Sequence, residues 1–300
     1  MANEDGADQV ETRRGGRTGR RRRLVFGKGK IPVRMLVPNF FTLLSLCAGV
    51  TAIRMAIEAR YDMAVALIAI AGLLDGIDGR VARALKASSR FGAELDSLAD
   101  FVNFGVAPAI LVYTWGLGQM KGLGWIAVLL FSCAMGLRLA RFNATIDVDK
   151  PRWQSNYFTG MPAPAGAITV LLPIYIHGLD LFDVRAYPHA IALYTFLMAC
   201  LLVSTLPTFS GKLMGERIPR EMVPPILIGV AAVVGFLVTY TYPTLAAITV
   251  VYLALIPWSV ARFRAKLALE PARAAVTAPG APPVVPSVTI APVDVPPTKR

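Results

Sequence analysis

Beyond residue 36 the chain alternates long apolar stretches with short polar breaks. A helix that crosses the hydrocarbon core of a bilayer needs about 20 mostly apolar residues. The period-two alternation of β-strands and short repeated motifs are both missing, which disfavours a β-barrel or a repeat protein. The pattern therefore predicts an all-α, polytopic integral membrane protein. Its eight spanning helices are expected at residues 37–58, 62–86, 92–116, 123–143, 161–179, 187–206, 223–241 and 243–262.

The two ends of the chain differ from this apolar body. Residues 1–34 are polar and basic, and no apolar stretch typical of a cleavable signal peptide follows the basic run. Residues 267–300 are rich in proline and alanine and lack the periodicity of a packed element. We therefore expect a basic cytoplasmic tail (1–34), a membrane domain (35–266) and a disordered tail (267–300).

Composition narrows the class of protein further. Hydrophobic residues make up 55% of the chain and charged residues 17%. An ordinary soluble domain has about 45–50% apolar and about 25% charged residues, so a soluble enzyme is disfavoured. The three cysteines lie in apolar runs without metal-ligand spacing, which is typical of small packing residues.

The positions of the basic residues explain the net charge of +12 as membrane topology. If both termini are cytoplasmic, 27 of the 31 lysines and arginines fall in cytoplasmic segments. Only Arg54, Arg60, Lys121 and Arg185 fall on the outer side. Such an excess is typical of cytoplasmic loops and attracts anionic lipid headgroups. We therefore expect the cytoplasmic (inner) membrane of a bacterium, contact with the lipid bilayer and no nucleic-acid partner.

Four aspartates lie near the facing ends of the second and third predicted helices: Asp75, Asp78, Asp96 and Asp100. Ionisable residues inside spanning helices are costly and usually mark a functional site. Because the link at residues 87–91 is short, the two helices should be antiparallel neighbours. At 100° per residue, each pair of aspartates falls on one face of its helix. The four carboxylates can therefore converge near the cytoplasmic face of the membrane.

Converging carboxylates repel one another unless cations neutralise them. Oxygen ligands without histidine or cysteine nearby select Mg²⁺, Mn²⁺ or Ca²⁺, and a two-metal site suits in-line displacement at phosphorus. Gly79, Ala82 and Gly92 on the same faces leave room for a bulky ligand, and Arg83 can bind phosphate. The alternative is a set of interhelical contacts or ion pairs with Arg80 or Arg83. It would account for one or two aspartates but not for four.

These residues form one motif of 26 residues, Asp75-x-x-Asp78-Gly79-x-x-Ala82-Arg83, then eight residues, then Gly92-x-x-x-Asp96-x-x-x-Asp100. The motif resembles the signature of the CDP-alcohol phosphatidyltransferase family at every fixed position. The resemblance implies an integral membrane enzyme, commonly a homodimer. Such an enzyme transfers a phosphatidyl group from CDP-diacylglycerol to an alcohol and releases CMP.

The resemblance also implies roles for individual residues. Two divalent cations, Mg²⁺ or Mn²⁺, would be held by Asp75, Asp78, Asp96 and Asp100. Asp100 would also be the general base for the incoming hydroxyl group. The CMP and pyrophosphate site would be lined by Gly79, Ala82, Arg83 and Gly92. Pro38-Asn39-x-x-Thr42 resembles a family motif at the start of the first helix, near the nucleotide. Asn39 would fit an ordinary helix N-cap equally well.

Three further stretches resemble the phosphatidylserine synthase branch of the family: Arg138–Asn143, Tyr157–Pro164 and Pro207–Lys212. They imply L-serine as the acceptor, and the carboxylate of serine needs a cation near the metals. The candidates for serine binding are Arg138, Arg141 and Lys212, with Asn143 as a polar partner. Snorkelling at the interface and positive-inside topology would explain the same basic residues without a role in binding.

Other functions stay open at this point. The same transfer could use glycerol 3-phosphate, inositol phosphate or choline as the acceptor. A cation-coupled transporter would need ionisable groups near the bilayer midplane in two repeated halves. Here the acidic residues lie toward one face in a single helical hairpin, which disfavours transport. A non-enzymatic membrane scaffold is the last alternative.

Overall fold

The computed structural model describes residues 36–87, 89–144, 157–180, 182–209 and 220–277. The chain forms two units, Met1–Pro32 and Val33–Arg300. The basic tail predicted for residues 1–34 lies outside the described residues, and so do residues 278–300. The described helices and strands therefore all belong to the second unit.

The apolar stretches form helices, as the hydrophobic pattern predicts. Residues 90–120 form one continuous helical segment in which short π-helical and 3₁₀ turns follow α3 and α4. These turns are η2 (Phe101–Val106), η3 (Tyr113–Leu117) and η4 (Gly118–Met120). The α-helices are α1 (Leu36–Ile57), α2 (Tyr61–Ala84), α3 (Arg90–Asp100), α4 (Ala107–Val112), α5 (Gly122–Ala144), α6 (Ala163–Val170), α7 (Leu172–His177), α8 (Pro188–Val203), α9 (Val223–Thr239) and α10 (Thr241–Thr277).

Two strands of three residues each add to the all-α arrangement that the pattern predicts. β1 (Tyr157–Thr159) pairs antiparallel with β2 (Pro207–Phe209), with Tyr157 opposite Phe209 and Thr159 opposite Pro207. Strands this short are at the lower limit of the usual length of about 3–10 residues, so no alternating pattern could reveal them. Short 3₁₀ turns, η6 (Val184–Ala186) and η8 (Arg220–Met222), complete the described elements.

Within the described residues, four helical segments are long and apolar enough to cross a membrane: Leu36–Ile57, Arg90–Met120, Gly122–Ala144 and Thr241–Arg262. Three further apolar stretches are shorter, at Ala163–His177, Pro188–Val203 and Val223–Thr239. These helices make the chain an integral membrane protein. By length and composition, four of the eight predicted spans are therefore candidates to cross the membrane.

The C-terminal helix is longer than its predicted span. α10 continues to Thr277, into the range predicted as a disordered tail from residue 267. The residues at this junction, 265–270, read Ala-Lys-Leu-Ala-Leu-Glu. All of these are strong helix formers, which explains why the helix does not end with the apolar stretch.

Buried polar contacts join α1, α2 and the 90–120 segment. The Ser45 hydroxyl donates to the Ala71 carbonyl at 2.8 Å, and the Asn103 amide Nδ2 donates to Ser45 Oγ at 2.8 Å. A Cβ at Gly49 would collide with Asn103 Oδ1, so α1 can approach this segment closely only with glycine there. The π-helical turn η2 begins directly after Asp100. Turns of this kind often lie at functional sites.

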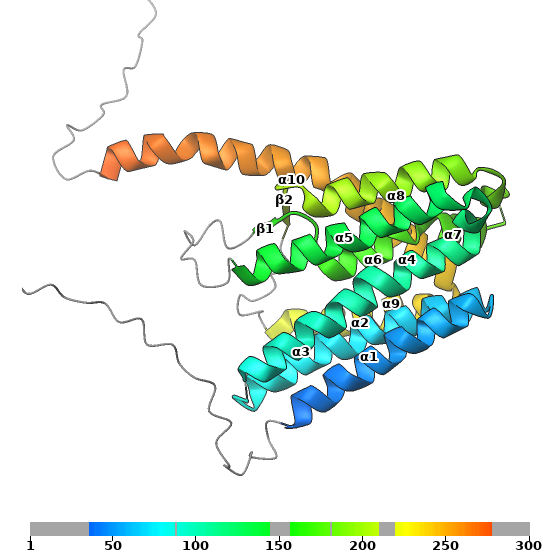
Figure 1. Cartoon of the computed structure of the whole chain (residues 1–300). Coiled ribbons are helices and arrows are strands. Elements are labelled where there is room, and N and C mark those ends of the chain that lie inside the picture. Colours follow the sequence, from blue (N-terminus) through cyan, green and yellow to red (C-terminus); the bar gives the residue numbers. More distant parts are fainter. Residues whose placement is uncertain (1–35, 88, 145–156, 181, 210–219, 278–300) are drawn as a thin grey trace, which may run out of the picture. The chain divides into compact units, whose positions relative to one another are not determined.

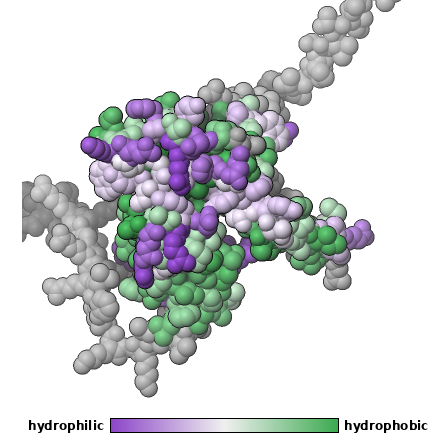
Figure 2. Space-filling view, turned by 90° about the vertical axis from the view of Figure 1, so that its right-hand side faces the viewer, coloured by the Kyte–Doolittle hydropathy of each residue, from purple (hydrophilic) through white to green (hydrophobic). Residues whose placement is uncertain are grey.

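The helix ends gather at two opposite ends of this unit (Figure 1). The start of α1, the α2–α3 turn, the end of α5 and both strands lie at one end, on the left in the view. Figure 2 looks onto the other end, where hydrophilic residues gather beside hydrophobic surface. Large apolar side chains are exposed along the helices, and α9 has no buried residue. Such surfaces suit contact with lipid.

Candidate functional site

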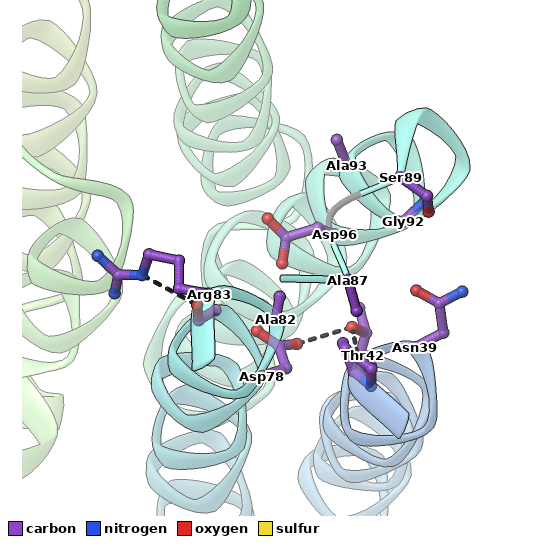
Figure 3. A pocket seen from close by; sticks show the side chains of 12 residues that line it. Asn39, Thr42, Asp78, Ala82, Arg83, Ala87, Ser89, Gly92, Ala93 and Asp96 are labelled. Atoms are coloured by element: carbon purple, nitrogen blue, oxygen red, sulfur yellow. Dashed lines mark hydrogen bonds between the residues drawn. The ribbon is translucent and has the colours of Figure 1, made fainter. Parts of the chain in front are cut away.

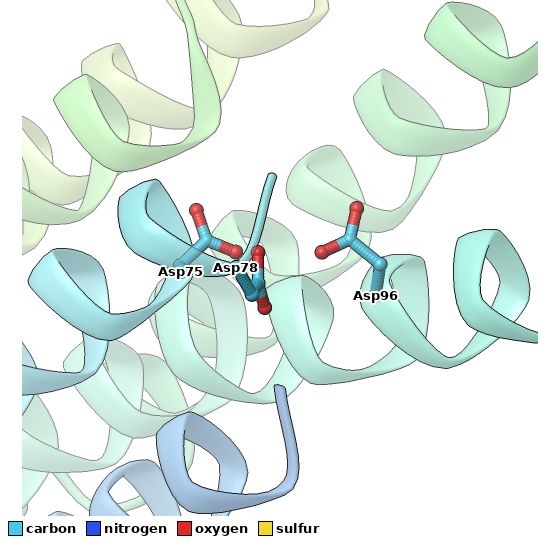
Figure 4. A group of neighbouring side chains, drawn as sticks. All are labelled: Asp75, Asp78 and Asp96. Atoms are coloured by element: carbon cyan, nitrogen blue, oxygen red, sulfur yellow. The ribbon is translucent and has the colours of Figure 1, made fainter. Parts of the chain in front are cut away.

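The α2–α3 hairpin brings aspartates from both helices together. One carboxylate oxygen from each of Asp75, Asp78 and Asp96 lies within 4.8 Å of the others. Figure 4 shows the three side chains pointing toward a common space, Asp75 and Asp78 from α2 and Asp96 from α3. Asp78 is buried, while Asp75 and Asp96 are partly exposed. These three residues could hold a metal ion, and we call them the acidic cluster.

Asp100 lies one helical turn beyond Asp96 and is not part of that group of three. Its carboxyl group is a close neighbour of Asp75 and interacts electrostatically with Asp96. Its Oδ1 atom is buried and has no hydrogen-bond partner among the described residues. Carboxylates that face one another away from water repel unless a proton or a cation lies between them. The arrangement therefore fits a bound cation.

Thr42 on α1 holds the acidic cluster from the side. Its hydroxyl donates to Asp78 Oδ2 at 2.7 Å and is also 3.2 Å from the Pro38 carbonyl. Both Thr42 and Asp78 are buried. The bond fixes the orientation of the Asp78 carboxyl group, as outer contacts commonly do for metal ligands.

A cavity of about 470 Å³ opens beside the acidic cluster, between the start of α1, the end of α2 and the start of α3 (Figure 3). All six residues predicted to bind CDP-diacylglycerol line it. These residues are Asn39, Thr42, Gly79, Ala82, Arg83 and Gly92. Asp78 and Asp96 form part of its wall, so a bound ligand would reach the acidic cluster directly.

The two glycines that line the cavity have different roles. A Cβ at Gly92 would lie 2.8 Å from Asn39 Oδ1 and 3.1 Å from Ser89 Oγ, so glycine permits this close packing. A Cβ at Gly79 would meet nothing within 4 Å. Gly79 therefore leaves open space next to the helix backbone, where a ligand can approach.

Asn39 and Arg83 lie on opposite sides of the cavity. Asn39 is inside α1, which begins at Leu36, and its side chain borders the cavity. The N-cap alternative is therefore wrong for this residue. Arg83 Nε donates to the Gly79 carbonyl at 3.0 Å. Figure 3 shows its guanidinium group turned away from Asn39 and Gly92, at the cavity edge.

Pro38, which the sequence analysis placed in the motif near the nucleotide, also lines the cavity, and sequence reasoning missed three further lining residues: Ala87, Ser89 and Ala93. Ser89 is the N-cap of α3, where its hydroxyl accepts a hydrogen bond from the Gly92 N–H at 3.0 Å. A serine three residues before Gly92 is a recognisable capping signal. The two alanines carry no chemical signal that could have revealed them.

Arg138 is a basic residue that the fold brings near Asp100. It lies near the C-terminal end of α5 and interacts electrostatically with Asp100. Its Nε donates to the Met161 carbonyl at 3.1 Å, and its guanidinium lies 5.6 Å from the centre of the Phe142 ring. The side chain is thus held in one place beside Asp100.

The other residues predicted to bind serine have different surroundings. Arg141 Nη1 donates to the Val203 carbonyl at 2.8 Å and lies 3.4 Å from the Ser204 carbonyl. Asn143 Nδ2 donates to Ser97 Oγ at 3.0 Å, which joins α5 to α3. Lys212 lies outside the described residues.

Two family models match the chain. Residues 35–206, more than half of its length, match the model of CDP-alcohol phosphatidyltransferase. Residues 221–257 match the model of CDP-alcohol phosphatidyltransferase 2. The first match contains the acidic cluster, the cavity and the arginines of α5.

Curated relatives with the name CDP-diacylglycerol–serine O-phosphatidyltransferase match part of the chain. The Mycobacterium leprae protein is 54% identical over 137 residues, 45% of this chain and 45% of the relative. A Helicobacter pylori protein is 39% identical over 141 residues, 47% of this chain and 58% of the relative. The Methanocaldococcus jannaschii protein is 32% identical over 191 residues, 58% of this chain and 86% of the relative. The chain thus spans about half the length of the mycobacterial relative.

Proposed function

We propose a reaction for this chain from the family to which it belongs, the CDP-alcohol phosphatidyltransferases. The hydroxyl of L-serine attacks the phosphorus that carries the diacylglycerol group of CDP-diacylglycerol. A P–O bond to serine forms, and the P–O bond to CMP breaks. The observation that carries this proposal is the acidic cluster beside a cavity lined by the signature residues. The names of the relatives favour serine over other alcohols.

The carboxyl groups fit two divalent cations, Mg²⁺ or Mn²⁺. All the side chains that could hold them offer oxygen, which suits these ions. The buried, unpartnered Oδ1 of Asp100 supports a cation nearby. The ions would be held by Asp75, Asp78, Asp96 and Asp100. When bound, they screen the negative charge of the pyrophosphate and of the leaving CMP.

In the proposed mechanism Asp100 accepts the proton of the serine hydroxyl. Its carboxyl group interacts with Asp75 in the acidic cluster and electrostatically with Arg138 on α5. A serine whose hydroxyl reaches Asp100 can place its carboxylate beside the Arg138 guanidinium, which supplies the opposite charge. Choline has no carboxylate, so a requirement for Arg138 would argue against choline. Arg141, Asn143 and Lys212 remain proposed contributors to serine binding, by direct contact or by holding the surrounding chain in position.

The cavity is the proposed site for the nucleotide end of CDP-diacylglycerol. Its volume of about 470 Å³ lies within the range of about 300–1,000 Å³ typical of small-molecule sites. The proposed contacts to CMP and pyrophosphate are Asn39, Thr42, Gly79, Ala82, Arg83 and Gly92. The pyrophosphate would lie toward Asp78 and Asp96, and the acyl chains would stay in the bilayer.

We also propose the membrane arrangement: eight crossings, both termini cytoplasmic and the site facing the cytoplasm of a bacterial inner membrane. The ends of α2 and α5 that carry the arginines lie at one end of the helical unit (Figure 1). This common end supports the positive-inside assignment. CDP and serine are polar, so a site near the cytoplasmic surface suits both. A homodimer is part of the proposal.

An acceptor panel tests this function. Purified protein receives CDP-diacylglycerol, Mn²⁺ and one alcohol at a time: serine, glycerol 3-phosphate, inositol phosphate or choline. We expect rapid CMP release with serine alone. Equal or faster release with another alcohol would contradict the serine assignment, and the absence of release with all four would contradict the enzyme assignment.

A further inference from the structure

Two arginines near the end of α5 bind the backbone of two different segments. Arg138 and Arg141 are three residues apart, so they lie on the same side of the helix. Arg138 Nε donates to the Met161 carbonyl, and Arg141 Nη1 donates to the Val203 carbonyl. Met161 follows β1, and Val203 ends α8 shortly before β2. Each arginine therefore holds the base of one strand.

The bases of the two strands also contact each other closely. The Gly160 N–H donates to the Leu206 carbonyl at 2.9 Å. Gly160 has φ +80°, and a Cβ there would lie 2.7 Å from the Ser204 carbonyl oxygen. Only glycine accepts both this conformation and this approach. The paired strands, which we call the β1–β2 ribbon, thus join α5 at two neighbouring points.

The β1–β2 ribbon starts next to the proposed reacting groups. Arg138 contacts the Met161 carbonyl on one side and interacts with Asp100 on the other. One side chain therefore separates the base of β1 from the proposed general base. The strands belong to Tyr157–Pro164 and Pro207–Lys212, two stretches far apart in sequence that the fold pairs.

We infer that Arg141 is a positioning residue that fixes the β1–β2 ribbon as the wall of the acceptor subsite. This inference rests on the proposed function. Its Nη1 group is directed at the carbonyls of Val203 and Ser204, at 2.8 and 3.4 Å. A guanidinium directed at backbone carbonyls orders the chain around it. Arg138 then faces the acceptor, and Arg141 holds the wall in place.

The first arm of the test is Arg141→Ala. Loss of a charged hydrogen bond corresponds to roughly a ten- to hundredfold change in an equilibrium. We expect the KM for serine to rise by about that factor. The KM for CDP-diacylglycerol should stay within about twofold, because the cavity lies on α1, α2 and α3. An unchanged KM for serine would overturn the inference.

The second arm of the test fixes the position of the β1–β2 ribbon by a disulfide in a protein that lacks Arg141. A disulfide between Tyr157→Cys and Phe209→Cys would tie β2 to β1, whose base Arg138 still holds. Because Gly160 and Leu206 are hydrogen-bonded partners, the alternation of the ladder makes Tyr157 and Phe209 a non-hydrogen-bonded pair. The Cα atoms of such a pair are about 4.5 Å apart, within disulfide range. Cys47, Cys133 and Cys200 are first replaced by alanine.

In the oxidised Arg141→Ala protein with both cysteines, the KM for serine should fall back most of the way to the parent value. A reducing agent should raise it again. The same cysteine pair with Arg141 intact is the matched control. A KM that stays high after the disulfide forms would overturn the inference, because Arg141 would then bind the acceptor itself. If the parent protein prefers another alcohol, the serine assignment fails separately, and the two arms are measured with that alcohol.

Discussion

The two sides of the proposed active site are built differently. On the nucleotide side, α1, α2 and α3 turn carboxylates and small residues toward an open cavity of about 470 Å³. On the acceptor side, Arg138 and Arg141 direct hydrogen bonds to backbone carbonyls near the strands. The first side is shaped to receive a charged ligand, and on the second side hydrogen bonds from arginines hold the backbone in place. Substitutions on the first side should therefore act on binding and chemistry, while a substitution of Arg141 on the second side should act on the position of the chain around the acceptor.

The largest effect should follow from changing the proposed general base. Asp100→Asn keeps the shape but removes the proton acceptor and one metal ligand. General-base catalysis is typically worth about 10²–10⁴-fold, so we expect kcat to fall at least about a thousandfold. CMP release by purified protein measures it.

Asp180→Asn is the matched control for Asp100→Asn. Asp180 has φ 54°, a conformation that asparagine also tolerates, and it follows α7 at the opposite end of the unit. Its activity should stay near that of the parent protein. Near-normal CMP release by Asp100→Asn would refute the role assigned to this carboxylate.

A smaller effect is expected at the contact behind the acidic cluster. Thr42→Val removes the donor to Asp78 Oδ2 and keeps the side-chain shape. Loss of such outer contacts typically lowers metal affinity about 10–100-fold. The Mn²⁺ concentration for half-maximal activity should rise accordingly, while activity at saturating Mn²⁺ recovers. An unchanged Mn²⁺ dependence would show that this bond does not orient a metal ligand.

The smallest effects separate the two glycines. Gly79→Ala adds a methyl group to open space, so the Tm should hold or rise, since alanine is favoured over glycine in a helix by roughly 0.5–1 kcal/mol. The KM for CDP-diacylglycerol should rise several-fold. In Gly92→Ala the added Cβ would instead lie 2.8 Å from Asn39 Oδ1. Overpacking of this kind typically destabilises a protein by about 1–3 kcal/mol, so the Tm should fall. Equal Tm changes in both variants would contradict the difference drawn between them.

The sequence could predict the nucleotide side because most of its residues lie in one hairpin with helical spacing, while Asn39 and Thr42 belong to a second motif on α1. A single 26-residue motif contains both pairs of aspartates, and the residues predicted around them line one cavity. Asp100 is the exception, since it adjoins Asp75 rather than entering the group of three. The neighbours of Asp100 depend on the orientation of its side chain. Helical periodicity predicts only which face of the helix carries a residue, not this orientation.

The acceptor side was harder to predict because its contacts join distant parts of the chain. The charges of Arg138 and Arg141 made them candidates for serine binding, but the sequence could not show that both bind carbonyls near β1 and β2. The strands themselves are too short for a periodic pattern. α2 is not among the four helices that are apolar enough to span a membrane, because it carries Asp75, Asp78 and Arg83 of the proposed site in addition to Asp62 and Arg80.

Dependence on divalent cations tests the central claim most directly. Purified parent protein and Asp96→Asn are treated with EDTA, then titrated with Mn²⁺ while CMP release from CDP-diacylglycerol and serine is followed. We predict no turnover of the parent protein in EDTA, full recovery with Mn²⁺, and little recovery of Asp96→Asn. Turnover that persists in EDTA, or an Asp96→Asn titration that matches the parent curve, would contradict the proposed metal site.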